Sequence, residues 1–272
     1  MSRIVHLISD STGETVSRLG DAAFSLFDSD QIDKRLHIFV RSAAEADSVI
    51  EDIRREPGLV ILTMVDQAQR QRIVDALRDM GLPFVPVLQP VIGALEAYLG
   101  SGATSRMGGQ YRVDDLYYRR VDAIDYAISH DDGALSDRLS RADVILTGVS
   151  RTSKTPTCIY LAVRGVKAAN LPLVPGAEPP AAFFRAIDKG VPVIALTASP
   201  SRLAQIRTHR LEVIGHDSGA DYAALDQIRR EVADARLLFD RIGAPVIDVT
   251  RRSIEETAAE ILAILREKGV LA

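Results

Sequence analysis

The feature that most constrains the fold of this chain is a regular alternation of two kinds of segment. Apolar runs of strand length alternate with amphipathic stretches of helix length along most of its 272 residues. Such alternation is typical of βαβ units, and near-continuous Val, Ile and Leu runs are typical of parallel strands covered on both faces. The sequence therefore predicts an α/β fold with mostly parallel sheets flanked by helices. In the first part of the chain the predicted strands are Ile4–Ile8, Arg35–Val40, Leu59–Thr63 and Pro83–Pro86, and the predicted helices are Glu14–Phe27, Ala43–Glu56 and Gln67–Met80.

The alternation is interrupted at Gly100–Gly109, where four glycines stand among small polar residues. Such a stretch is typical of a loop or a domain junction. We therefore predict an N-terminal α/β domain over residues 1–108 and a second α/β domain over residues 109–272. A predicted helix follows the junction, with Tyr117, Val121, Ile124 and Ile128 on one apolar stripe. Beyond it the predicted strands are Asp143–Leu146, Leu171–Val174, Val191–Leu196 and Pro245–Val249, and the predicted helices are Pro156–Arg164, Ala181–Asp188, Ser201–Arg210, Tyr222–Arg241 and Ile254–Lys268.

Composition excludes several classes of protein. With 33 Lys and Arg against 37 Asp and Glu, the formal net charge is −4, whereas a dedicated nucleic-acid binder usually carries a basic excess. The apolar runs are far shorter than the roughly 20 residues of a membrane span, and the N-terminus has no secretory signal. The single cysteine, Cys158, suits a reducing compartment. We expect a cytoplasmic protein that binds neither nucleic acid nor membrane.

The strongest motif joins the predicted strand Asp143–Leu146 to the predicted helix Pro156–Arg164. It has the G-x-x-x-x-G-K-[ST] spacing of a phosphate-binding loop, with a serine in place of the second glycine. Backbone N–H groups at a helix N-terminus hold phosphate oxygens, the lysine adds a full charge, and the threonine is placed to ligate Mg²⁺. The predicted nucleotide-binding residues are Gly148, Val149, Ser150, Arg151, Thr152, Ser153, Lys154 and Thr155.

The same loop also has a purely structural interpretation, in which its hydroxyl groups only cap the following helix. Ser153 is the weak point of the phosphate-binding interpretation, because a left-handed residue other than glycine costs about 1 kcal/mol or more. The buried strand before the loop and the apolar helix after it favour phosphate binding. We expect Lys154 to be solvated, so that Lys154→Ala would weaken nucleotide binding and leave folding nearly unaffected.

A pair of carboxylates precedes the strand that leads into the loop. Asp131 and Asp132 could act as a general base, as a Mg²⁺ ligand or as both. In the alternative interpretation they are solvated residues at a helix end that Gly133 caps. Acidic side chains are unfavourable at a helix C-terminus, which mildly favours a functional role.

Three further segments have weaker signals. Ser9–Thr15 follows the first predicted strand and is either a capping box at Ser11 and Glu14 or a second anion-binding loop. The proline-rich turn Leu173–Pro180 either closes over a site or only connects two elements. A basic helix face with Arg202, Arg207 and Arg210 either meets phosphate or is solvated, as such faces usually are.

Several of these motifs, in the same order, resemble a known family. Gly148–Pro156 is similar to the signature of the bifunctional regulatory proteins of pyruvate, phosphate dikinase and of phosphoenolpyruvate synthase. The resemblance also includes Ser9–Thr15, Tyr118–Gly133, Leu171–Gly176 and Pro245–Thr257, so it extends over nearly the whole chain. Thr152 and Ser153 resemble the dikinase branch more closely.

The resemblance implies two phosphoryl transfers. A kinase activity uses ADP as the donor and phosphorylates a threonine of the target enzyme, which inactivates it. A phosphorylase activity uses inorganic phosphate to remove that group and releases pyrophosphate. The implied cofactors and substrates are ADP, Mg²⁺ and inorganic phosphate, and the implied partner is the dikinase or the synthase.

The resemblance also implies roles for individual residues. Lys154 would hold the diphosphate, Thr155 would bind Mg²⁺, and Asp131 or Asp132 would accept the proton of the target threonine. Arg151 and the Ser11–Thr15 loop are candidates for the phosphate site. A small-molecule kinase and a nucleotide sensor without catalysis remain alternatives, and a homodimer remains open as an assembly state.

Overall fold

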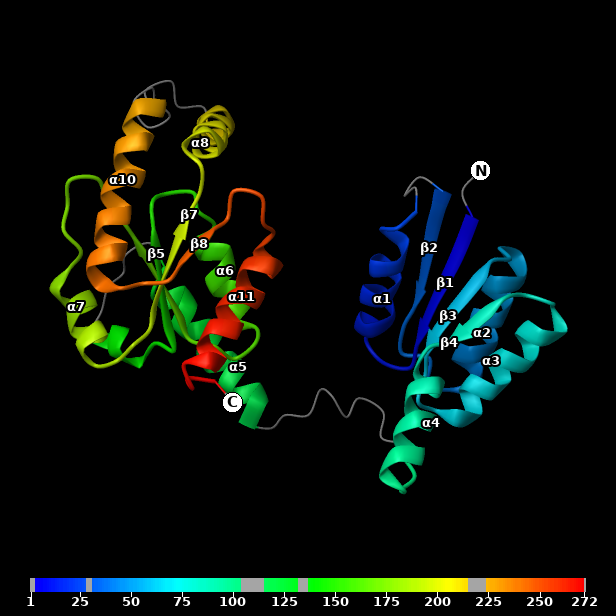
Figure 1. Ribbon diagram of the computed structural model, residues 1–272. Helices are drawn as coiled ribbons and strands as arrows, with labels where there is room; N and C mark the ends of the chain where they lie inside the picture. The colour runs from blue at the N-terminus through cyan, green and yellow to red at the C-terminus, as the bar shows by residue number, and fades with distance from the viewer. Residues whose placement is uncertain (1–2, 28–30, 104–114, 132–136, 215–223, 272) are drawn as a thin grey trace. The chain divides into compact units, whose positions relative to one another are not determined.

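Two four-stranded sheets, each with all its strands parallel, form the framework of the chain (Figure 1). The computed structural model describes residues 3–27, 31–103, 115–131, 137–214 and 224–271. The chain divides into two units, Met1–Arg112 and Val113–Ala272. The predicted α/β class with mostly parallel sheets is confirmed. The predicted boundary between residues 108 and 109 lies outside the described residues and stays a prediction.

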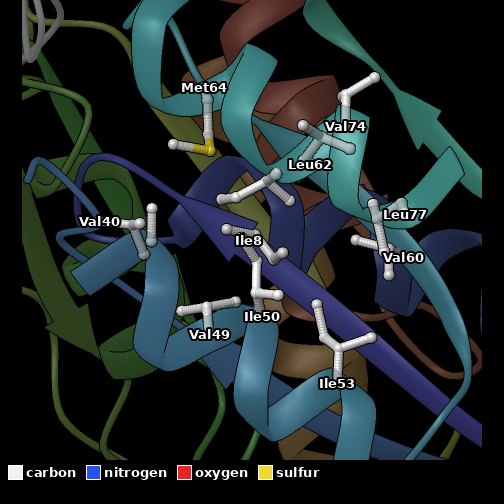
Figure 2. Packing of buried hydrophobic residues seen from close by; sticks show 12 residues of the cluster. Ile8, Val40, Val49, Ile50, Ile53, Val60, Leu62, Met64, Val74 and Leu77 are labelled. Atoms are coloured by element: carbon white, nitrogen blue, oxygen red, sulfur yellow. The ribbon is translucent and has the colours of Figure 1, made fainter. Parts of the chain in front are cut away.

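The first unit has the strand order β2-β1-β3-β4. Helices α2 and α3 cover one face of this sheet and α1 covers the other (Figure 1). Its elements are β1 (Arg3–Ser9), α1 (Glu14–Phe24), β2 (Ile32–His37), α2 (Ala43–Arg55), β3 (Leu59–Thr63), α3 (Gln67–Asp79), β4 (Phe84–Pro86) and α4 (Leu88–Leu99). Figure 2 shows the larger core of this unit, in which Ile8 of β1 and Leu62 of β3 pack against Ile50 of α2.

Two parts of the first unit differ from the sequence-based expectation. The second strand ends at His37 and not at Val40, because Phe39 has a φ of 57°, which an extended strand does not tolerate. Helix α4 was not expected from the sequence, and none of its residues is buried. An apolar helix without a buried face lacks the amphipathic pattern on which the sequence reasoning depends.

The second unit has the strand order β6-β5-β7-β8. Helices α6 and α11 pack on one face of this sheet, and α7 and α10 pack on the other. Its elements are α5 (Asp115–Ser129), the 3₁₀ helix η3 (Asp137–Arg141), β5 (Val144–Gly148), α6 (Lys154–Ala162), β6 (Ala168–Pro172), α7 (Ala181–Asp188), β7 (Val193–Thr197), α8 (Pro200–Ile214), α10 (Leu225–Ile242), β8 (Val246–Asp248) and α11 (Ile254–Glu267).

Only Ile124 of the predicted apolar stripe on α5 packs against the core. Tyr117, Val121 and Ile128 are each more than 40% exposed. The buried face of the helix instead carries Ala123 and Ala127, which pack against Ala162 of α6. Small side chains allow the two helices to approach closely, so packing favoured the alanines over the larger apolar residues.

Among the described residues, no helix is long and apolar enough to span a membrane.

Candidate functional site

The segment between β5 and α6 places a sharp turn at the carboxyl end of the second sheet. Gly148 has a φ of 146°, which L-residues with a side chain rarely adopt. A Cβ atom at this position would lie 2.2 Å from the carbonyl oxygen of Leu196 in β7. Only glycine therefore fits here, and the motif's first glycine has a definite steric cause.

The rest of the turn contains two left-handed residues other than glycine, Arg151 with a φ of 71° and Ser153 with a φ of 60°. The Thr152 hydroxyl between them donates to the carbonyl of Val149 at 3.0 Å, which braces the turn. Ser153 occupies the N-cap position of α6 without a side-chain capping bond. The capping interpretation is therefore wrong for Ser153, which takes the left-handed conformation expected of the replaced glycine. Left-handed residues interleaved with ordinary ones form the concave N–H surfaces that bind anions.

Of the loop residues, Lys154 differs most from the environment expected from the sequence. It is only 5% exposed, and its Nζ donates to the carbonyls of Gly148 at 2.9 Å and Val149 at 2.8 Å. The expectation that Lys154 is solvated is wrong, since the ammonium group lies under the turn and holds its two ends together. A phosphate bound to this loop would meet a charge that the fold has already positioned.

Three polar side chains meet at the start of α6. The Thr155 hydroxyl donates to Asp131 Oδ1 at 2.9 Å, and the Asn170 amide donates to the same oxygen at 2.7 Å. Asn170 Nδ2 also lies 3.0 Å from Thr155 Oγ1. The structure therefore brings Asp131 and Thr155 together, as a functional role for both requires. Asp131 is half-buried and bonded, so its interpretation as a solvated helix-end residue is wrong; Asp132 and Gly133 lie outside the described residues.

Asn170 was missed by the sequence reasoning, which placed the strand over Leu171–Val174 and not over Ala168–Pro172. The available signal was a single amide side chain between apolar neighbours in a buried strand. The backbone N–H of Asn170 donates to the carbonyl of His130 at 3.1 Å, which ties β6 to the residue before Asp131. His130 is itself buried and stacks on Tyr126 with 4.0 Å between ring centroids. These contacts fix the backbone that carries Asp131.

The oxygen atoms of this cluster suit a magnesium ion. Asp131 supplies a carboxylate and Thr155 a hydroxyl, and the buried Asn170 Oδ1 has no hydrogen-bond partner in the described part of the chain. Mg²⁺ prefers such hard oxygen ligands and usually binds through one or two protein groups together with phosphates. The residues present therefore fit this ion.

Two titratable side chains near the cluster are kept uncharged by their surroundings. Burial raises the pKa of the Cys158 thiol, and the negative charge of Asp131 adds to the effect while Lys154 opposes it. Burial also raises the pKa of the Tyr126 phenol. Cys158 is thus an unreactive core residue, as its position in an apolar helix indicates.

A buried ion pair between α8 and α10 contacts the loop. Arg207 of α8 is fully buried and its guanidinium donates to Glu231 of α10 at 2.7 Å. The same guanidinium lies 3.4 Å from the carbonyl oxygen of Ser150 in the loop. The expectation of a solvated basic face is therefore wrong for Arg207, although Arg202 and Arg210 are exposed.

The turn after β1 in the first unit does not form the predicted capping box. Helix α1 begins at Glu14, and its N-cap is Gly13 in a left-handed conformation with no side-chain capping bond. Asp10 is buried, and its Oδ2 accepts from the N–H groups of Val65 at 2.6 Å and Asp66 at 2.9 Å. The anion-binding interpretation of Ser11–Thr15 stays a prediction, against which the negative charge of Asp10 weighs.

Comparisons with known proteins identify the family of this chain. The sequence model of the kinase/pyrophosphorylase family matches residues 5–262. A relative in Caulobacter vibrioides is 45% identical over 96% of this chain and 82% of its own length, and one in Rhodospirillum rubrum is 44% identical over 96% and 94%. Each carries a name that provisionally assigns it as a pyruvate, phosphate dikinase regulatory protein. By the extent of these matches, the chain belongs to the kinase/pyrophosphorylase family.

Proposed function

We propose that this chain regulates pyruvate, phosphate dikinase by adding a phosphoryl group to one of its threonines and by removing it again. ADP is the donor in the first reaction and inorganic phosphate is the acceptor in the second. Membership of the kinase/pyrophosphorylase family supports a phosphotransferase, and the names of the relatives support the target. The donor, the acceptor residue and the cytoplasmic location are proposals that rest on the resemblance of the motifs.

One observation carries the chemistry. The Asp131 carboxylate lies 2.9 Å from the Thr155 hydroxyl, in the first turn of the helix that follows the glycine loop. This contact supports a role for Asp131 as a general base beside the place where a helix N-terminus would hold the phosphates. Phosphoryl transfer depends mostly on positioning and on neutralising charge, and this arrangement offers both.

In the forward direction, Asp131 accepts the proton of the target threonine as its hydroxyl oxygen attacks the β-phosphorus of ADP. The bond between that phosphorus and the bridging oxygen breaks, and AMP leaves with the electron pair. Lys154 and the backbone N–H groups of the loop hold the diphosphate, with Arg151 at its exposed side. Thr155 and the Asn170 amide oxygen would hold Mg²⁺, which would neutralise phosphate charge when bound.

In the reverse direction, an oxygen of inorganic phosphate attacks the phosphorus of the phosphothreonine. The bond to the threonine oxygen breaks, that oxygen takes the proton that the attacking hydrogen phosphate carried, and pyrophosphate is released. The attacking phosphate is already anionic, so this direction does not require a base at the nucleophile. The base and the phosphate loop therefore contribute differently to the two reactions.

The test incubates the full chain with Mg²⁺, ADP and histidine-phosphorylated pyruvate, phosphate dikinase, and measures phosphothreonine by mass spectrometry and AMP by chromatography. We expect both products with ADP and less with ATP. Phosphothreonine on phosphoenolpyruvate synthase alone would move the target to that enzyme. AMP formation from a small acceptor without protein would indicate a small-molecule kinase, and ADP binding without modification would indicate a sensor.

A further inference from the structure

A cavity of about 420 Å³ lies beside the loop, between the proline-rich turn after β6 and helix α10. Its size falls within the roughly 300–1,000 Å³ of small-molecule sites. The turn contributes Leu173 and Val174 to its wall, and the helix contributes Asp234 and Leu238. Neither of the two proposed phosphoryl transfers gives this cavity a role.

The cavity is continuous with the phosphate loop. Val149, the second residue of the loop, is part of the cavity wall. The backbone N–H of Leu173 donates to the carbonyl of Gly148 at 3.1 Å, so the wall is attached to the first residue of the loop as well. A ligand with its phosphates on the loop could therefore extend into the cavity.

The charges of the wall decide which end of such a ligand enters. Three carboxylates line the cavity, against the single guanidinium of Arg241. Arg241 pairs with Glu178 at 2.9 Å and the buried Arg207 pairs with Glu231 at 2.7 Å, which leaves the exposed Asp234 as a further negative charge. This environment repels a phosphate but accepts hydrogen bonds from hydroxyl and amino groups, while the leucine side chains offer apolar contact.

The cavity and the proposed base lie on opposite sides of the loop. Val149 packs with residues of α10 on one face of the sheet. Asp131 and Thr155 meet at the start of α6, which packs on the other face. In phosphoryl transfer the attacking and leaving oxygens lie roughly in line across the phosphorus. An acceptor that approaches Asp131 therefore requires a leaving group on the side of the cavity.

We propose that this cavity binds the nucleoside of the donor nucleoside diphosphate. The nucleobase lies against the leucine side chains, and the ribose hydroxyl groups lie near Asp234. The inference rests on the proposed function, because it takes the diphosphate to lie on the Gly148–Thr155 loop. It assigns a use to the proline-rich turn, which forms one wall of the nucleoside site.

The test compares two ligands that share a diphosphate and differ in the nucleoside. Ala177 is an exposed residue of the turn that lines the cavity, so Ala177→Trp fills the cavity and leaves the core intact. Ala233→Trp is the matched control, an exposed position of α10 that does not line the cavity. Calorimetry measures the affinity of each full-length variant for ADP and for inorganic pyrophosphate, with Mg²⁺ present.

We expect Ala177→Trp to bind ADP about tenfold or more weakly, which corresponds to roughly 1.4 kcal/mol, and to bind pyrophosphate like the unchanged protein. Ala233→Trp should bind both ligands normally. Unchanged ADP affinity in Ala177→Trp would overturn the inference, and so would an equal loss for ADP and pyrophosphate, which would locate the effect in the loop. If the unchanged protein bound neither ligand, the proposed function itself would fail.

Discussion

The two sheets have the same topology, but the turn after the first strand carries a negative side chain in one unit and a positive one in the other. In each unit the first strand lies between the second and the third, and the fourth strand pairs with the third. The turn after the first strand therefore lies at the carboxyl end of a central strand in both, where α/β folds bind ligands. In the first unit this turn begins with Asp10, and in the second it leads to Lys154.

The chemical difference is one of charge. Asp10 turns its carboxylate inward and accepts from the N–H groups of Val65 and Asp66, at the start of α3. The first unit thus fills its own helix N-terminus with a resident anion. Lys154 places a cation under the turn, whose left-handed residues form a surface for an external anion. The shared topology provides the position, and the residues of the turn decide whether a ligand can use it.

The largest effect should come from Asp131→Asn, which keeps an acceptor for the Thr155 hydroxyl but removes the base. Loss of a general base typically lowers a rate by about 10²–10⁴-fold. We expect this loss in the kinase reaction, a much smaller loss in the phosphorylase reaction, and retained ADP binding. Mass spectrometry of target phosphothreonine measures both directions.

The control for that variant is Asp122→Asn, which changes an exposed acid of α5 that forms an ion pair with Lys167. It should leave both rates unchanged. If both activities of Asp131→Asn fell together and the Mg²⁺ dependence shifted, Asp131 would act as a metal ligand and not as a base. Unchanged rates in both directions would remove Asp131 from the mechanism.

The two turns can also be compared through their glycines. In Gly148→Ala the new Cβ would meet a backbone oxygen at 2.2 Å, whereas in Gly13→Ala it would meet the Ile38 side chain at 2.7 Å. Backbone cannot yield as a side chain can, so we expect losses in unfolding free energy of about 2–5 kcal/mol for Gly148→Ala and about 1–2 kcal/mol for Gly13→Ala. Urea unfolding measures both, and equal losses would contradict the steric explanation.

Much of this molecule could be predicted from residue pattern because its central strands, such as β5 and β7, are buried on both faces. Leu59–Thr63 and Ala181–Asp188 have the bounds expected from the sequence. The pattern failed where burial did not follow hydrophobicity. On α5 the alanines are buried and Ile128 is exposed, because close helix packing selects small residues.

The site was predictable only in part for a related reason. The spacing of Gly148, Lys154 and Thr155 locates the loop, since backbone geometry requires those residue types locally. Asn170 and Arg207 depend on contacts across 39 and 57 residues of sequence, with Asp131 and Ser150 respectively. No local sequence pattern indicates contacts between residues so far apart in the chain. Asn170 was therefore missed, and Arg207 was misinterpreted.

Lys154→Ala should reduce both binding and stability, which is the opposite of a solvated loop lysine. Loss of a charge-assisted phosphate contact costs roughly 1.5–3 kcal/mol, or about tenfold to more than a hundredfold in ADP affinity. The carbonyls of Gly148 and Val149 also lose their buried partner, which costs about 1–3 kcal/mol of unfolding free energy. Calorimetry with ADP and urea unfolding measure the two effects.

The matched change in the first unit is Asp10→Ala. It leaves the N–H groups of Val65 and Asp66 without their carboxylate and should cost a similar amount of unfolding free energy. ADP affinity should not change. An ADP affinity that fell in Asp10→Ala as far as in Lys154→Ala would break the distinction between the two turns.

The smallest predicted effect is a pH dependence of the unfolding free energy. We expect it in the first unit, because that unit contains the paired side chains of His6 and His37. His6 Nε2 donates to the carbonyl of Glu56 at 2.8 Å, so its Nδ1 accepts from His37 Nε2 at 3.0 Å. Burial lowers the pKa of His37 from its usual 6.5, the electrostatic interaction with His6 lowers it further, and the interaction with Asp52 opposes both. The folded state therefore binds fewer protons than the unfolded state near that pH.

The sign of the pH effect follows from this difference. The contribution of His37 is fully present above pH 6.5 and is lost as the pH falls through its lower folded-state pKa. We expect the unfolding free energy of the first unit to fall on acidification from pH 7 by no more than about 1.4 kcal/mol per pH unit. His37→Gln keeps a donor for His6 but cannot titrate, so hydrogen exchange of β1 and β2 amides should show a shallower pH dependence in this variant. Amides of β5 and β7 should respond equally in both proteins, and an unchanged slope in β1 and β2 would show that His37 does not set the acid sensitivity of this unit.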